Sequence, residues 1–240
     1  ALMVWGMRVG VEFAELFEDR QLSNDCKAAE KKLVKAASKV YKKFLASCPA
    51  PDAPGSKQVT ALMTITGLID APKADKEFLS INGAQGFSTF YGYYMLEAMA
   101  MAGNYQGALD VIREYWGAMI DLGATSFWED FDINWIPNAA PIDELVPEGK
   151  KDIHGDCGAY CYVGFRHSLC HGWASGPTSW LSRHILGVEV IEPGCRQVRI
   201  TPHLGDLQWV KGTFPTPYGE LQIYHEKQAN GNVISEVKAP

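Results

Sequence analysis

The sequence lacks an excess of basic residues, an uninterrupted apolar run of membrane length and a repeated cysteine pattern. Its 22 Lys and Arg residues against 28 Asp and Glu residues give a formal charge of −6. No nucleic acid and no membrane surface is therefore expected as a partner, because either would need a basic face. Arg8, Glu12 and Glu15 interrupt the apolar start of the chain, which argues against a signal peptide or a membrane span there. A neutral or cationic ligand is the better expectation.

The cysteines do not form a metal-binding pattern. The closest pair, Cys157 and Cys161, lies in a glycine-rich stretch and lacks the second ligand pair that a zinc site needs. A disulfide within that stretch is left open, as is the zinc alternative, since three histidines lie nearby: His154, His167 and His171. We expect no metal, nucleotide or redox cofactor, and the cysteines do not fix the redox compartment.

Helical periodicity, repeatedly stopped by glycine, dominates the first part of the chain. Apolar residues at helical spacing predict that Val4, Met7, Val11 and Ala14, followed by Phe17 or Glu18, form one buried stripe. A second stripe is predicted at Leu33, Ala37, Val40, Tyr41 and Phe44, with the neighbouring lysines turned outward. The three prolines of residues 48–55 predict a loop that ends the basic helix. The other predicted helices cover residues 2–18, 56–67, 71–83, 88–102, 105–121 and 175–187.

After Gly187 the apolar period changes from 3.6 to 2, which predicts a small antiparallel sheet. Asn230-Gly231 predicts a type I′ hairpin turn between the last two strands. Helix pairs without a fixed sequence repeat favour an α/α toroid over a solenoid. We therefore predict a mainly α protein, with part of an α/α toroid over 1–187 and an unfinished β-sandwich over 188–240. The proline- and glycine-rich segment 131–168 is expected to be a long loop over one end of the toroid.

Polar groups that can act together cluster beside aromatic, glycine-rich segments. They are Glu129, Asp130, Asp132, His167 and His171, with Trp128, Trp135 and Trp173 as aromatic neighbours. Burial against an indole raises the pKa of a carboxyl group toward the range useful for proton transfer, and indole faces bind sugar rings. A glycosidase site is one interpretation. The alternatives are a loop carboxylate for Glu129, a packed histidine for His171 and solvated side chains for the others.

Two motifs in the second half of the chain carry a family resemblance. "GATSFWED" (123–130) is similar to a Gly-Ala-Thr-Thr-x-Trp-Glu motif, and "SLCHGWASGPTSWL" (168–181) is similar to Ser-Phe-Asn-His-Tyr-Ala-x-Gly-x-x-x-x-Trp-Leu. Both occur in the α-L-rhamnosidases of glycoside hydrolase family 78. The less specific segments 1–17, 26–44, 56–69 and 81–112 also resemble the family in order, as parts of its catalytic barrel.

The resemblance implies a six-hairpin (α/α) barrel followed by a β-sandwich, and inverting hydrolysis of α-L-rhamnosides. It implies that Glu129 is the general base, that His171 contacts the rhamnose and that Trp128 braces Glu129 and walls the sugar site. The general acid is expected upstream of Ala1, so a preceding part of the same polypeptide is expected as the chain's partner. The run Glu18-Asp19-Arg20 lacks the family's setting for that acid. Cys170 replaces the usual Asn, and 42 positions separate Glu129 from His171, more than is usual in the family.

Other functions are compatible with the same residues. One is a different toroidal carbohydrate enzyme, an uronate hydrolase or a polysaccharide lyase, in which Tyr91 or His171 moves the proton. Another is a non-catalytic carbohydrate-binding domain derived from such an enzyme. The compartment, either exported or cytoplasmic, stays open because any export signal would lie before Ala1.

Overall fold

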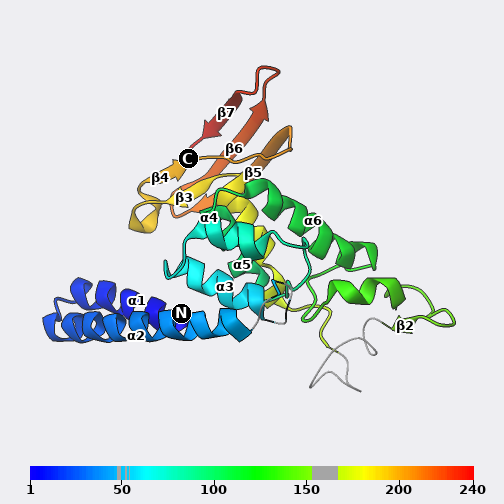
Figure 1. Ribbon diagram of the computed structural model, residues 1–240. Helices are drawn as coiled ribbons and strands as arrows, with labels where there is room; N and C mark the ends of the chain where they lie inside the picture. Colours follow the sequence, from blue (N-terminus) through cyan, green and yellow to red (C-terminus); the bar gives the residue numbers. More distant parts are fainter. Residues whose placement is uncertain (48–49, 52, 54, 153–166) are drawn as a thin grey trace.

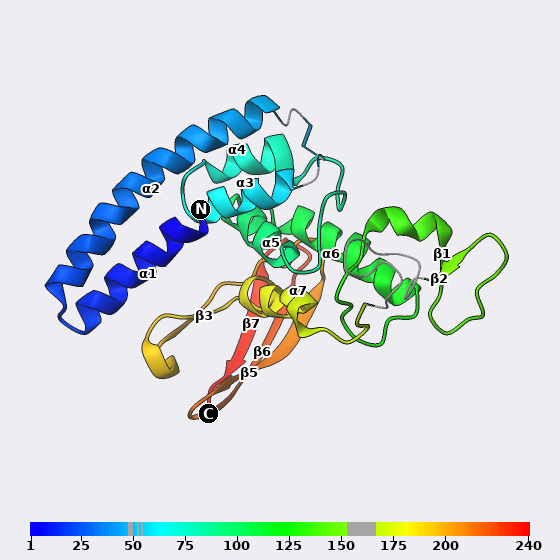
Figure 2. The ribbon, with the colours of Figure 1, turned by 90° about the horizontal axis from the view of Figure 1, so that it is seen from below.

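The helical part of the protein forms a central body from which one long helix pair projects. The computed structural model describes residues 1–47, 50–51, 53, 55–152 and 167–240. Helices α1 (Leu2–Leu16) and α2 (Arg20–Ser47) run antiparallel as the projecting pair (Figures 1 and 2). The turn between them contains Glu18 and Asp19, and the Asp19 carboxylate accepts the amide hydrogen of Leu22, 2.9 Å away. Asp19 thus caps the start of α2.

The body is built around α5 (Gly92–Met101) and α6 (Tyr105–Asp121). Helix α3 (Ser56–Ile65) packs on α5, and α4 (Ala71–Ala74) continues into the π-helical turn η1 (Asp75–Leu79). Helix α7 (Gly176–Trp180) continues similarly into η5 (Leu181–Ile185) and also packs on α5. The indole N–H of Trp180 donates to the Leu96 carbonyl at 3.0 Å, so this large buried side chain has a satisfied polar group.

Segment 131–152 is less structureless than predicted. It contains the 3₁₀ helix η2 (Ile133–Asn138) and a short parallel pair of strands, β1 (Ala139–Ala140) and β2 (Lys151–Asp152). The remainder of the predicted loop, with His154, Cys157 and Cys161, lies outside the described residues, apart from His167 and Ser168. Residues 48, 49, 52 and 54 of the proline-rich 48–55 loop lie outside them too.

The chain ends in antiparallel β-structure, as the period-2 pattern predicts. Strands β3 (Val188–Val190) and β4 (Val198–Ile200) pair with each other, after which β5 (Trp209–Thr216), β6 (Gly219–Lys227) and β7 (Val233–Lys238) form a three-stranded sheet. Leu186, Val188, Leu221 and Ile223 form a small core between the two layers. The first strand that the sequence predicts is the run RQVRITP at 196–202, so β3 was not predicted, because three residues directly after a helix give too short a signal.

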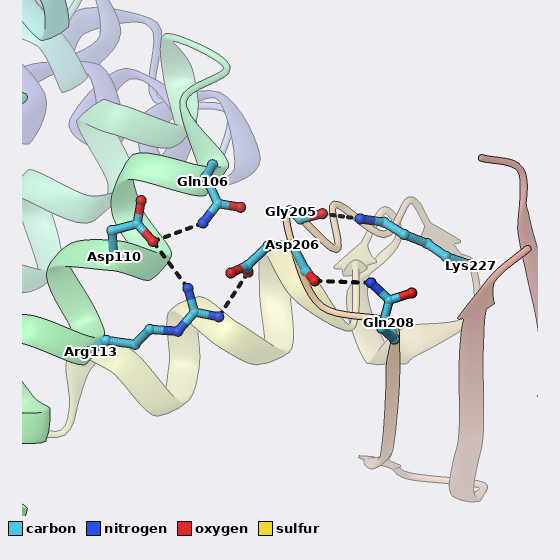
Figure 3. A network of polar contacts seen from close by, with 7 residues as sticks. All are labelled: Gln106, Asp110, Arg113, Gly205, Asp206, Gln208 and Lys227. Carbon is cyan, nitrogen blue, oxygen red and sulfur yellow. Dashed lines mark hydrogen bonds and ion pairs between the residues drawn. The ribbon is translucent and has the colours of Figure 1, made fainter. Parts of the chain in front are cut away.

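A polar seam joins the sheet to the helical body (Figure 3). Arg113 of α6 binds Asp110 on its own helix at 3.0 Å and Asp206, in the loop before β5, at 2.8 Å. On the far side of that loop, the Lys227 ammonium donates to the Gly205 carbonyl. Exposed ion pairs contribute little stability, so the packing of Leu207 and Val210 against the core of the body is the stronger attachment.

The predicted helices are largely confirmed, and three details are wrong. Helix α5 begins at Gly92 rather than near 88, because residues 88–91 form a turn. Phe17 is 73% exposed because it lies at the far end of the projecting pair. Val40 is 65% exposed, and it lines an open groove with Val59 and Leu62 of α3. The Asn230-Gly231 turn is not of type I′, which needs positive φ at both residues: only Gly231 has it, and the Gly231 amide bonds the Gln228 carbonyl in a longer loop.

No helix in the described part of the chain is long and apolar enough to cross a membrane. Val4 and Ala14 are buried and Met7 and Val11 half-buried, as predicted for the first stripe. In α2 Leu33, Ala37 and Tyr41 are half-buried and the lysines face solvent. The side chain of Phe44 lies outside the described residues. The boundary between residues 187 and 188 stays a prediction.

Candidate active site

The segment that contains Glu129 begins where α6 ends. Gly123 has a φ of +89°, a conformation that L side chains rarely adopt, and its amide bonds the Ile120 carbonyl at 2.9 Å. The amide of Ala124 bonds the Met119 carbonyl, also at 2.9 Å. These bonds close the helix and direct residues 124–130 across the body in an irregular conformation.

The two family-like motifs lie side by side in the structure. The Glu129 amide donates to the Ser168 carbonyl at 2.8 Å, and the His171 amide donates to the Phe127 carbonyl at 2.7 Å. These two backbone bonds connect segments about 40 positions apart in sequence, so the folded chain brings Glu129 and His171 together although neither motif specifies the other.

Glu129 is fixed through both its backbone and its carboxylate. The Ser168 amide donates to Oε2 at 2.8 Å. The Glu129 carbonyl accepts bonds from the Thr89 hydroxyl at 2.6 Å and from the indole of Trp173 at 2.7 Å. The side chain keeps 19% of its surface exposed. A partly exposed carboxylate that is anchored at one oxygen is preorganised to accept a proton at the other.

His171 is adjacent to this carboxylate. Its Nδ1 lies 3.8 Å from Glu129 Oε1, which is longer than a direct hydrogen bond. Its ring is tilted against that of Trp173, with centroids 4.5 Å apart, and its side chain is 35% exposed. A polar pair at this spacing is commonly bridged by a water or by a ligand hydroxyl.

Trp128 lies beneath the site rather than at its surface. Its side chain is 0% exposed and contacts Phe131 in an edge-on arrangement at 5.9 Å. Phe131 in turn packs on Tyr115, whose hydroxyl donates to the Phe131 carbonyl. Among the described residues the indole N–H of Trp128 has no hydrogen-bond partner. The position suits bracing of Glu129, whereas the predicted contact of Trp128 with sugar stays a prediction.

The other residues suggested by the sequence have different surroundings. Asp132 caps η2, where its Oδ1 accepts the amide of Asn134 at 2.9 Å. His167 is buried with its ring 6.0 Å from that of Trp135. Cys170 is an exposed free thiol whose Sγ lies 3.5 Å from the Ser126 hydroxyl. The described residues hold no group of three or more His, Cys, Asp or Glu side chains placed to bind a metal.

Asp130 lies directly after Glu129 and is partly buried. Burial raises the pKa of its carboxyl group, and the neighbouring charges of Asp132 and Glu129 raise it further, against a lowering effect of the Phe131 amide. Burial, with Asp130 and Asp132, also holds the pKa of Tyr115 well above its ordinary value. The charges of Asp130 and Asp132 therefore act on the buried Tyr115 hydroxyl under the site.

We expect Asp130→Asn to change how stability depends on pH. A carboxyl group with a raised folded pKa binds more protons in the folded state, so stability falls as pH rises from the ordinary aspartate range through the raised value. The variant should lose this fall and be at least as stable as the parent at neutral pH, measured by urea unfolding across the acidic range. The exposed Asp143→Asn is the control. Parallel curves for parent and Asp130→Asn would contradict the expectation.

Sequence reasoning did not identify Thr89 as part of the site. A single threonine in a turn carries no signal of its own, and only the fold places its hydroxyl on the Glu129 carbonyl. Trp173 was named only as an aromatic neighbour. Its position two residues after His171 is the sequence signal that could have assigned it to the site.

The chain is similar to known α-L-rhamnosidases in part of its sequence and in its fold. Residues 187–240 match the model for the bacterial alpha-L-rhamnosidase C-terminal domain. The whole chain is similar in fold to a GH78 family rhamnosidase of Bacillus sp. GL1, with 22% identity, a TM-score of 0.73 and coverage of 99% of this chain. It is also similar to an alpha-L-rhamnosidase from Dictyoglumus thermophilum, with 19% identity, a TM-score of 0.65 and 96% coverage. No curated protein matches.

These similarities decide the fold. The chain spans 24% of the length of each of these two structures. The helices are accordingly part of a helical toroid, and the strands after it are a small β domain, as predicted. The chain is similar to the C-terminal part of the α-L-rhamnosidases of glycoside hydrolase family 78. The similarity is one of fold over nearly the whole chain and one of sequence over residues 187–240.

Proposed function

We propose that this chain carries the general-base half of an inverting glycosidase site that acts on terminal α-L-rhamnosides. The observation that carries the proposal is the carboxylate of Glu129, anchored at Oε2 by the Ser168 amide and facing His171 with Oε1. The similarity of the chain to rhamnosidase structures supports the choice of sugar.

The geometry suits the activation of a water molecule. With Oε2 occupied by an amide hydrogen, Oε1 is the oxygen nearer the histidine, and a water between Oε1 and His171 Nδ1 could bond both. Glu129 would take a proton from that water while the water oxygen attacks the anomeric carbon. His171 would contact the rhamnose ring, and Trp128 would hold Glu129 from below.

An inverting reaction needs a second carboxyl group, roughly 6.5–9.5 Å from the first, to protonate the leaving oxygen. We propose that the complete polypeptide supplies it from residues upstream of Ala1. Glu18 and Asp19 are unsuitable, because they lie at the free end of the projecting α1–α2 pair. The 240-residue chain by itself should therefore be a poor catalyst.

The direct test is the stereochemistry of hydrolysis by the complete polypeptide. We expect it to release rhamnose from an aryl α-L-rhamnoside, with the β anomer appearing first when the reaction is followed by proton NMR. The 240-residue chain, assayed in parallel, should release little. First appearance of the α anomer would contradict inversion. An unsaturated product absorbing in the ultraviolet, formed from a uronate-containing polysaccharide, would instead indicate a lyase, and saccharide binding without any turnover would indicate a binding domain.

A further inference from the structure

A continuous row of aromatic rings begins beside Glu129 and crosses the surface of the helical body. The row consists of Trp173, Phe90, Tyr91, Tyr94 and Trp5, and we call it the aromatic strip. The ring centroids are 5.6 Å apart for Trp173 and Phe90, 5.8 Å for Phe90 and Tyr94, and 6.3 Å for Tyr94 and Trp5. Tyr91 lies 5.1 Å from Phe90 and 6.1 Å from Tyr94.

The strip connects elements that are distant in sequence. Trp5 belongs to α1, Tyr94 to α5, and Trp173 to the segment that follows His171. The near end is tied to the candidate active site, because the Trp173 indole donates to the Glu129 carbonyl and its ring packs on His171. The far end lies at the base of the projecting helix pair, close to the N-terminus marked in Figures 1 and 2.

In the 240-residue chain the large rings of the strip are accessible. Trp173 is 43% exposed, Trp5 is 40% exposed and Phe90 is 38% exposed, while Tyr91 and Tyr94 are half-buried. Trp and Phe are usually buried for most of their surface, and contiguous exposed apolar patches on soluble proteins commonly mark binding sites. The edge-on and tilted contacts within the strip leave ring faces available to a ligand.

The strip is also uncharged. Residues 81–96, which supply three of the five rings, contain no Asp, Glu, Lys, Arg or His, and neither do residues 1–7, which supply Trp5. An anionic or cationic ligand would find no opposite charge on this stretch. Uncharged ring faces that include two tyrosines, each with a hydroxyl, instead match a neutral ligand that alternates C–H faces with hydroxyl groups, as a sugar chain does.

We propose that the aromatic strip binds successive sugar rings of the substrate's leaving group, so that the substrate class is a neutral oligosaccharide with a terminal rhamnose rather than a small rhamnoside. This inference rests on the function proposed above. The terminal sugar would lie at Glu129 and His171, and the following rings would lie on Trp173, Phe90 and Tyr94 toward Trp5.

The test compares two substrates in the complete polypeptide: an aryl α-L-rhamnoside and a neutral trisaccharide with a terminal α-L-rhamnose. In Phe90→Ala and Trp5→Ala, we expect the ratio of kcat/KM for the trisaccharide to kcat/KM for the aryl rhamnoside to fall about tenfold, through KM. Trp5→Tyr keeps a ring and should retain most of the ratio. Phe13→Ala is the matched control, because Phe13 lies on the same helix, is 57% exposed and packs on Phe17 rather than on the strip.

Binding is measured separately by calorimetric titration of the trisaccharide into Glu129→Gln and into the same variant carrying each strip substitution. Weaker binding, with Kd about tenfold higher in the strip variants, supports the strip even if no rhamnoside is cleaved, in which case only the proposed function fails. Normal cleavage with unchanged Kd and an unchanged ratio overturns the strip alone. A fall in Tm for the strip variants with unchanged Kd also overturns it, because it would mean that the rings are covered by the polypeptide itself.

Discussion

Replacement of Glu129 by Gln in the complete polypeptide should lower kcat for an aryl α-L-rhamnoside by about 10²–10⁴-fold, the usual contribution of a general base. Gln keeps a side-chain oxygen that can accept the Ser168 amide hydrogen, and the backbone bonds from Thr89 and Trp173 do not involve the carboxylate. Because these contacts survive, the variant should fold and fail in proton transfer.

KM should change far less than kcat, because the amide has nearly the shape of the carboxylate but cannot accept a proton at neutral pH. Glu144→Gln, an exposed change in the 141–150 segment, is the control for loss of one negative charge. A Glu129→Gln variant with full activity would refute the assignment of the base. A parallel loss of kcat and Tm would show that Glu129 acts through folding instead.

Gly187→Ala should produce the largest loss of stability of any single methyl addition considered for this chain. Gly187 has a φ of +79°, and a Cβ atom there would lie 2.4 Å from the Thr201 carbonyl carbon and 2.6 Å from the Pro202 nitrogen. The left-handed conformation alone costs about 1–2 kcal/mol for an L residue. The backbone of 201–202 cannot rotate away as a side chain could, so we expect about 4 kcal/mol or more in total.

The matched control is Gly194→Ala. Gly194 has a similar φ of +75°, but no atom lies within 4 Å of the position that a Cβ would take there, so only the conformational cost of about 1–2 kcal/mol should appear. Thermal and urea unfolding of the two variants would separate the two costs, with Gly187→Ala lower in Tm by several degrees more. Equal losses would mean that the β-strand pair can move away from the helical body at Gly187.

Local signals in the sequence were enough for most elements. The apolar periods of 3.6 and 2 predicted the helices and the strands, and the glycine residues at their ends predicted where several helices stop. The helix α6 illustrates this: Asn104 caps it by accepting the Gly107 amide at 2.9 Å, and Gly123 ends it. Such interactions lie within a few residues of each other, so the residues that make them can be read together.

The burial of single side chains and the type of the last hairpin turn could not be predicted from local sequence signals. Val40 has the spacing of a buried residue, yet its burial depends on what packs beside α2. The turn at Asn230-Gly231 has a typical type I′ dipeptide, but the register of β6 with β7, in which Lys227 is opposite Val233, leaves a longer loop to close. In both cases the outcome depends on contacts between distant parts of the chain.

By itself the sequence determined the helical class, the change to antiparallel strands after Gly187 and the identity of Glu129 and His171 as candidates, because periodicity and motif are local properties. The tertiary structure decided that the segments around 127–129 and 168–171 pair, that Trp128 is turned into the core, and that Thr89 and Trp173 hold the backbone of Glu129. Those contacts join residues up to 44 positions apart, and only the packing of α5, α6 and α7 brings them within hydrogen-bond distance.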